Sequence, residues 1–311
     1  MNEEFKNDVD KGLSASPKYL DSKYFYDARG DELFVKIMHM PEYYLTDAEM
    51  EVFKTRANDI VHSFGINGRK LELIELGAGD GSKTVELLKK MQGSYQFTYI
   101  PIDISEHVLR VLCNRLADEV PGMKAKPMHG DYFEILELIK DTQVHKIILF
   151  LGSTIGNLSE PELFVTRLAE RMHAGDKLLL GVDLKKDPDL ILKAYNDAQG
   201  ITREFNLNLL RRINRELGGN FDISKFRHTP LYNEQVGQAE SYIESTEEQF
   251  VPIAATGKTY HFNKGERIHT EISRKFDDEA IEQLITGTGL YIKKKFTDSK
   301  NYYADYLLEM K

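Results

Sequence analysis

Short apolar runs alternate with amphipathic segments from Leu71 onward, and this alternation constrains the fold more than any other feature of the 311-residue chain. The apolar runs are predicted to be strands, over Leu71–Leu76, Phe97–Ile102, Ala125–His129, Lys146–Leu151 and Lys177–Val182. The segments between them have helical periodicity, over Lys83–Met91, Glu106–Val120, Phe133–Ile139 and Glu160–Met172. A capping-box pattern makes Ser159 the expected N-cap of the last helix. We therefore expect an α/β fold with a doubly wound, mostly parallel sheet.

The pattern changes after Leu184, where a long helical stretch, Leu190–Leu217, is broken near Gly200. Strand-like pieces then follow around residues 241–243, 249–253 and 268–272, and the tail returns to a helix, 278–286, and two strands, 291–296 and 303–310. We expect residues 56–184 and 276–311 to form the core. Residues 1–55 and the insertion 185–275 are expected to form a second, smaller lobe.

Charge and composition exclude several kinds of partner. Acidic residues outnumber basic ones by 50 to 41, for a formal charge of −9, so a nucleic acid is an unexpected partner. No stretch approaches the roughly 20 apolar residues that span a bilayer, and the N-terminus is charged. The single cysteine, Cys113, forms no disulfide framework. We expect a cytoplasmic protein that binds no membrane and has no obligate protein partner.

A glycine-rich loop, Glu75-Leu-Gly-Ala-Gly-Asp-Gly81, stands where the first predicted strand ends and a helix begins. Glycines let the chain turn tightly there and let a ligand approach the bare backbone. This pattern alone fits nicotinamide cofactors, flavins and S-adenosylmethionine, and it also fits a purely structural turn.

Acidic residues at the next two strand ends narrow the choice of cofactor. Asp103 closes the second strand, where its carboxylate can accept hydrogen bonds from both ribose hydroxyls. The third strand ends in Gly130-Asp131-Tyr132, where an acid and a ring can meet the adenine, although Asp131 could also be a helix N-cap. A dinucleotide needs no acid at the third strand end. The three strand ends together favour S-adenosylmethionine.

The chain resembles the histidine Nα-methyltransferase family, S-adenosylmethionine-dependent enzymes of the ergothioneine pathway, over nearly its full length. The resemblance is carried by Tyr24-Phe-Tyr-Asp-Ala-Arg-Gly30, Pro41-Glu-Tyr-Tyr-Leu-Thr46, Glu75-Leu-Gly-Ala-Gly79, Phe150-Leu-Gly-Ser-Thr-Ile-Gly-Asn157, Phe205-Asn-Leu-Asn208 and Thr270-Glu-Ile-Ser273. It implies a class I methyltransferase sheet, closed by the terminal strand hairpin, with a smaller substrate-binding lobe. It also implies Nα-methylation of L-histidine, to the trimethylated product.

The resemblance also implies roles for individual residues. On the substrate side, Asn157 would hold the amino and carboxylate groups, Tyr26, Tyr43 and Tyr195 would line the pocket, and Glu271 with Ser273 would bind the imidazole. Asn157 and Tyr26 are the expected catalytic residues. On the cofactor side, the matching positions are Gly77, Lys83, Asp103, Asp131 and Tyr132. No metal is implied.

One departure from the family pattern leaves a second substrate open. Where the family commonly has Trp-Ile-Glu-Met, this chain has Tyr242-Ile-Glu-Ser245, so a bulky apolar contact expected near the substrate side chain becomes small and polar. Another aromatic amino acid or an indole amine is therefore the alternative substrate.

The chemistry of methyl transfer agrees with the residue types at the predicted site. Transfer from a sulfonium is an in-line displacement that needs an unprotonated amine held in line with the methyl group. A carboxylate beside the amine would stabilise the ammonium form, whereas the neutral amide of Asn157 would not. A hydrolase is disfavoured because Gly152-Ser-Thr-Ile-Gly156 is not a GxSxG motif. A non-catalytic S-adenosylmethionine-binding protein remains a remote alternative.

Overall fold

The computed structural model describes residues 3–65, 70–139 and 144–311, which form two compact units. Unit 1 contains residues 1–44 and 186–274, and unit 2 contains residues 45–185 and 275–311. The expected boundary at residue 55 lies inside a helix, α3 (Tyr44–Ser63), and the units change at Tyr44 and Leu45 instead. The reason is that Val52 and Phe53 of α3 are fully buried in the core of unit 2.

Unit 2 is built on a seven-stranded sheet with the order β12-β13-β6-β5-β2-β3-β4. Its strands are β2 (Leu71–Leu76), β3 (Phe97–Asp103), β4 (Met128–His129), β5 (His145–Phe150), β6 (Lys177–Asp183), β12 (Leu290–Thr297) and β13 (Tyr303–Met310). The first five run parallel, and β13 pairs antiparallel with both β6 and β12. The predicted doubly wound sheet with a terminal hairpin is confirmed.

Alternate residues of the central strands feed two separate cores, one on each face of this sheet. In β2, Leu73 packs in one core and Ile74 in the other; in β5, Ile147 and Ile148 divide in the same way. The first core also contains side chains of α3, α4 (Thr84–Met91) and α5 (Glu106–Glu119). The second contains side chains of α6 (Tyr132–Ile139), α7 (Pro161–Ala169) and α10 (Asp278–Leu284). Burial on both faces explains why these strands are continuous apolar runs.

The predicted start of α7 is wrong by one residue. Glu160, not Ser159, occupies the N-cap position, and Pro161 is the first helical residue. A proline favours that place because its fixed φ suits the helix and its missing N–H is not needed there.

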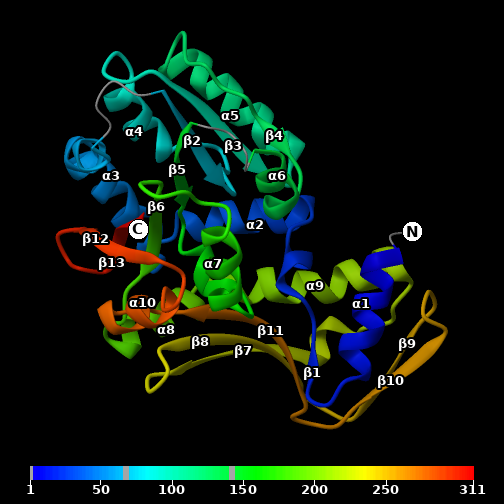
Figure 1. The fold of residues 1–311 in the computed structure, drawn as a ribbon. Coiled ribbons are helices and arrows are strands. Elements are labelled where there is room, and N and C mark those ends of the chain that lie inside the picture. Colours follow the sequence, from blue (N-terminus) through cyan, green and yellow to red (C-terminus); the bar gives the residue numbers. More distant parts are fainter. Residues whose placement is uncertain (1–2, 66–69, 140–143) are drawn as a thin grey trace. The chain divides into compact units, whose positions relative to one another are not determined.

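Unit 1 combines a four-stranded sheet, with the order β1-β11-β8-β7, and a hairpin of β9 and β10. The strands are β1 (Lys18–Tyr19), β7 (Phe226–Asn233), β8 (Gln238–Ser245), β9 (Gln249–Ile253), β10 (Lys258–Phe262) and β11 (Arg267–Arg274), and the helices are α1 (Glu3–Ser14), α2 (Ala28–Met38), α8 (Pro188–Tyr195) and α9 (Ile201–Leu217), with short 3-10 turns at Ser22–Phe25 and Ile223–Lys225. The break near Gly200 is confirmed, since Gly200 is left-handed (φ 71°) before α9 begins. Figure 1 shows α8 and α9 beside β7 and β8, on which both helices pack.

Besides the two-residue strand β1, the strands β7 and β10 of unit 1 have no counterpart in the sequence prediction. β7 contains Pro230, which lacks the N–H that a central strand needs, and it lies at the edge of the sheet, where proline is tolerated. β10 has only two buried residues, Tyr260 and Phe262. Neither β7 nor β10 contains an apolar run long enough to be recognised as a strand from the sequence.

None of the described helices combines the length and the apolar content that crossing a membrane requires.

Candidate active site

The glycine-rich loop of unit 2 has the backbone that its glycines allow. Gly77, Gly79 and Gly81 all have positive φ values, of 68°, 57° and 69°, between the end of β2 and the start of α4. A side chain at Gly77 would clash, because a Cβ there would lie 2.8 Å from the Tyr132 hydroxyl. The open side is at Gly79, where a Cβ would have no described atom within 4 Å. A ligand can approach the backbone at this point.

Asp103 ties this loop to the end of β3. Its Oδ2 accepts a hydrogen bond from the Gly79 N–H at 3.1 Å, and its Oδ1 accepts one from the Ser105 N–H at 2.9 Å. Each carboxylate oxygen has two lone pairs, so both can accept a further donor such as a ribose hydroxyl. The half-buried side chain is therefore oriented before any ligand binds.

The third strand end places Asp131 and Tyr132 at the start of α6. Asp131 is the helix cap, because its Oδ1 accepts from the Phe133 N–H at 2.8 Å and from the Glu134 N–H at 3.4 Å. Burial raises the pKa of Tyr132 to about 12, so this hydroxyl stays protonated at neutral pH. The Tyr132 ring packs edge-to-face on Phe150, with the centroids 6.1 Å apart.

Ile104 is a residue that the sequence reasoning missed. It follows Asp103 directly, and 79% of it is exposed, which is unusual for an isoleucine. The signal was an apolar residue immediately after a strand-end acid. An exposed aliphatic side chain beside the carboxylate could cover one face of a purine.

Lys83 and Asn157 both lie in segments that follow strands of unit 2, β2 and β5. Lys83 directly precedes α4, and its ammonium group is paired with the carboxylate of Glu49, a second residue that sequence reasoning missed. Burial alone would lower the pKa of Lys83, but the negative charge of Glu49 raises it above the ordinary value, so Lys83 is charged. Asn157 is exposed and ends the 3-10 helix η2 (Thr154–Asn157), which follows β5.

Four of the predicted substrate residues gather in unit 1. On β11, Glu271 and Ser273 pair with Ser241 and Ala239 of β8, so these four side chains share one face of the sheet. Ala239 packs in a small cluster with Tyr195 of α8, and Tyr43 contacts the same cluster. The Ser241 hydroxyl donates a hydrogen bond to Glu271 Oε2 at 3.4 Å. The result is a polar pair of residues beside tyrosine rings.

His228 of β7 contacts Ser241, the residue that donates a hydrogen bond to Glu271. Its Nε2 is 3.3 Å from the Ser241 hydroxyl, and burial lowers the pKa of His228 to about 4. The imidazole is therefore neutral at physiological pH and adds no positive charge beside Glu271.

Tyr26 lies between the 3-10 turn Ser22–Phe25 and α2, and 46% of it is exposed. Its ring packs edge-to-face on Phe34 and Phe205, with centroid distances of 5.5 and 5.8 Å. Asn157 and the predicted cofactor residues belong to unit 2, and the remaining predicted substrate residues belong to unit 1.

The expectation about Ser245 is wrong. Ser245 is fully buried at the end of β8, where its hydroxyl donates to the Glu247 carbonyl at 2.8 Å and accepts from Gln249 Nε2 at 2.6 Å. Ser245 is four positions along β8 from Ser241, the partner of Glu271, which corresponds to about 13 Å along a strand. Ser245 therefore stabilises a turn and does not enlarge a pocket at Glu271.

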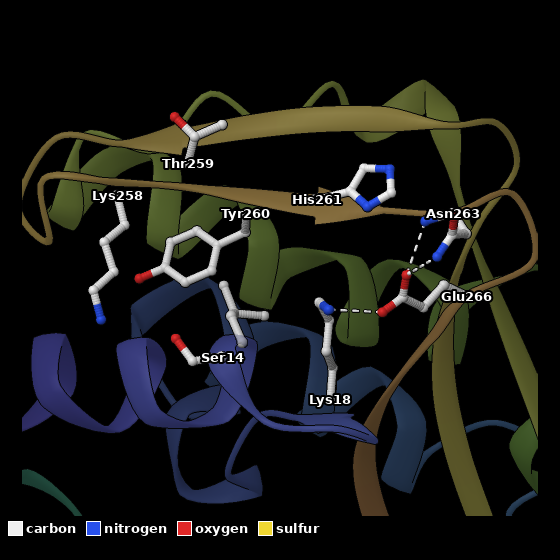
Figure 2. Close-up of a pocket in the computed structure, with 9 residues that line it drawn as sticks. Ser14, Lys18, Lys258, Thr259, Tyr260, His261, Asn263 and Glu266 are labelled. Carbon is white, nitrogen blue, oxygen red and sulfur yellow. Dashed lines mark hydrogen bonds and ion pairs between the residues drawn. The ribbon is translucent and has the colours of Figure 1, made fainter.

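A further hollow of unit 1 lies between α1 and β10 (Figure 2). Its lysines are already paired, Lys18 with Glu266 at 2.7 Å and Lys258 with Asp10 at 2.7 Å. Among the residues that the structure describes, none of the predicted site residues lines this hollow, and no group of three or more potential metal ligands occurs.

The glycine loop, Asp103 and the Asp131–Tyr132 pair lie at the carboxyl ends of the neighbouring strands β2, β3 and β4. The sequence model of histidine-specific, SAM-dependent methyltransferases matches residues 5–310. The chain belongs to this family. It is an S-adenosylmethionine-dependent N-methyltransferase.

Individual relatives of this methyltransferase agree with the family match. A histidine N-alpha-methyltransferase from Mycolicibacterium smegmatis is 37% identical over 299 residues, which cover 95% of this chain and 92% of that protein. The ergothioneine biosynthesis protein 1 of Neurospora crassa is 30% identical over 92% of this chain but only 32% of its own length. An L-tryptophan methyltransferase from Psilocybe serbica is 29% identical over 94% of this chain and 89% of that protein.

Proposed function

We propose that this methyltransferase acts on the α-amine of L-histidine and adds three methyl groups. The observation that carries the proposal is the polar pair on β11, Glu271 and Ser273, on the same face as Ala239, which packs with Tyr195. A carboxylate and a hydroxyl two residues apart on a strand can bond the two nitrogens of one imidazole ring. The similarity to a histidine N-alpha-methyltransferase supports this choice of substrate.

Asn157 is the residue proposed to meet the reacting amine. The amide is neutral, so it can orient the nitrogen lone pair without stabilising the ammonium form. In each step the nitrogen attacks the methyl carbon, the carbon–sulfur bond breaks, and the sulfonium becomes a neutral thioether. A proton must leave the nitrogen before the next attack, so three transfers convert the ammonium form of histidine into a quaternary ammonium with the loss of three protons. Tyr26, Tyr43 and Tyr195 are proposed to bind the substrate from unit 1, with residues 185–275 and the N-terminal segment as the substrate lobe.

The cofactor is proposed to bind between the glycine loop and the strand-end acids. Asp103 would hold the ribose, Asp131 and Tyr132 the adenine, and Lys83 the carboxylate, which is the only anionic group of S-adenosylmethionine. Ile104 would cover the adenine face from the other side.

Asp103→Ala should weaken S-adenosylmethionine binding at least about tenfold, because it removes two hydrogen bonds worth about 1 kcal/mol each, or more with a charged acceptor. Calorimetry with purified protein measures the affinity. Asp118→Ala, on an exposed position of α5, is the matched control and should bind normally. An unchanged affinity in Asp103→Ala would remove the ribose role.

The proposed substrate is tested by incubating the enzyme with S-adenosylmethionine and each of the twenty amino acids, followed by mass spectrometry. We expect histidine to gain 14, 28 and finally 42 mass units, about one methylene per transfer, with the last product accumulating. Tryptophan as the preferred substrate would instead support the alternative that the similarity to the Psilocybe serbica enzyme suggests. Accumulation of a monomethylated or dimethylated product would contradict trimethylation.

A further inference from the structure

Glu49 of α3 is a buried carboxylate that joins three separate segments of unit 2. Only 1% of this residue is exposed. Its Oε2 is paired with the Lys83 ammonium group, and its Oε1 accepts hydrogen bonds from the Gly152 N–H at 2.8 Å and from the Tyr303 hydroxyl at 2.7 Å. A buried charge is tolerated only when it is paired and hydrogen-bonded, and these donors meet that requirement.

Tyr303 extends this network to the turn that leads to Asn157. Its hydroxyl donates to Glu49 and accepts from the Ser153 N–H at 2.9 Å. Ser153 has a left-handed backbone, with φ 56°, which a residue with a Cβ adopts only when its surroundings enforce it. The Ser153 hydroxyl also accepts from the Asp183 N–H at 2.9 Å. The turn is thus held on both sides immediately before η2, the short helix that ends at Asn157.

Asp305 lies beside this network without belonging to it. Both of its carboxyl oxygens are buried and have no hydrogen-bond partner among the described residues. A Cβ at Gly181 would lie 2.5 Å from the Tyr303 hydroxyl, 2.9 Å from Glu49 Oε1 and 3.1 Å from Asp305 Oδ1, so glycine leaves the space that these groups need. Burial, and then the negative charge of Glu49, raise the pKa of Asp305 well above its ordinary value. The protonated, neutral form of Asp305 is therefore favoured at this buried position.

We propose that Glu49 and Tyr303 are positioning residues. Their buried hydrogen-bond network fixes both Lys83, on the cofactor side, and Asn157, on the substrate side. Through Oε2, Glu49 fixes the Lys83 ammonium group where the cofactor carboxylate binds. Through Oε1 and the Tyr303 hydroxyl, it fixes the turn at Gly152 and Ser153, and thereby the place of Asn157. The inference rests on the roles proposed above for Lys83 and Asn157.

Two substitutions test the Lys83 contact and the Ser153 contact of this network separately. Glu49→Gln keeps an oxygen for Gly152 and Tyr303 but turns an NH2 group toward the Lys83 ammonium, so the KM for S-adenosylmethionine should rise about tenfold or more while kcat changes little. Tyr303→Phe removes the acceptor of the Ser153 N–H and leaves Lys83 paired, so kcat should fall about tenfold or more with the KM for the cofactor within about twofold. Asp305→Asn copies the shape of the neutral acid and is the matched control, with both constants within about twofold of wild type.

Steady-state kinetics and thermal unfolding of each full-length variant decide the proposal. A rise in KM for Glu49→Gln together with a fall in kcat for Tyr303→Phe supports it. Equal changes of both constants in both variants, in step with lowered unfolding temperatures, would show a merely structural role and overturn it. Tyr303→Phe loses one hydroxyl only, so its kinetic split remains a test if Glu49→Gln does not fold.

Lys83→Met distinguishes a failure of this inference from a failure of the proposed function. If Lys83→Met leaves the KM for S-adenosylmethionine unchanged, the proposed role of Lys83 in cofactor binding is wrong. If Lys83→Met raises that KM but Glu49→Gln does not, the role of Lys83 stands and the positioning role of Glu49 is wrong.

Discussion

Asn157→Asp should lower kcat by a factor of about a hundred or more, while S-adenosylmethionine still binds with nearly wild-type affinity. The substitution keeps the shape of the side chain but replaces a neutral amide by a negative charge. That charge would stabilise the ammonium form of the substrate, whose nitrogen has no lone pair to attack the methyl group, and would repel the substrate carboxylate. Single-turnover kinetics with calorimetry of cofactor binding would separate the two effects.

A charge added elsewhere in unit 2 is the control for this experiment. Asn114→Asp places the same charge on an exposed position of α5 and should leave turnover unchanged. Near wild-type kcat/KM in Asn157→Asp would mean that Asn157 is not at the reacting nitrogen. A pH profile adds a further check, because a carboxylate beside the amine should shift the rise in activity to higher pH.

The sheet of unit 2 could be predicted because its strands are buried on both faces. Runs such as Leu71–Leu76 are continuously apolar, and their spacing by amphipathic helices leaves few alternatives. The same logic does not reach unit 1, whose strands are half-buried and rich in polar residues. There β7 and β10 carry their information in pairings with distant strands rather than in local sequence.

The predicted cofactor residues lie where the sequence ties a residue to the end of an apolar strand. Asp103 and the glycine loop follow apolar runs, so topology alone brings them to one edge of the sheet. Glu49 could not be found in this way, because it lies in an ordinary amphipathic helix. Its proposed role depends on a contact with Tyr303, 254 residues later in the chain. Ser245 was misjudged for the related reason that register, rather than proximity in sequence, decides which residues of β8 face Glu271.

Glu271→Ala should lower kcat/KM for histidine by a factor of about a hundred or more, and the enzyme's preference for histidine over tryptophan should decrease. In the proposed site Glu271 and Ser273 bond the two ring nitrogens of histidine, which phenylalanine lacks, so discrimination against phenylalanine should be on the order of a thousandfold or more. Tyrosine and tryptophan can each satisfy at most one partner, and they should be intermediate. The Ser241 hydroxyl donates a hydrogen bond to Glu271 Oε2 at 3.4 Å, so the carboxylate is oriented before the substrate binds.

The control for this prediction lies on the same pair of strands. Glu240 is adjacent to Ser241 in β8 and is paired with Ile272, so its side chain points to the opposite face of the sheet from Glu271. Glu240→Ala should therefore leave the order of substrates unchanged, whereas Glu271→Ala should alter it. Competition assays with equal concentrations of histidine, tryptophan, tyrosine and phenylalanine measure that order directly. A wild-type preference for phenylalanine, or an unchanged order in Glu271→Ala, would mean that this carboxylate does not read the imidazole ring.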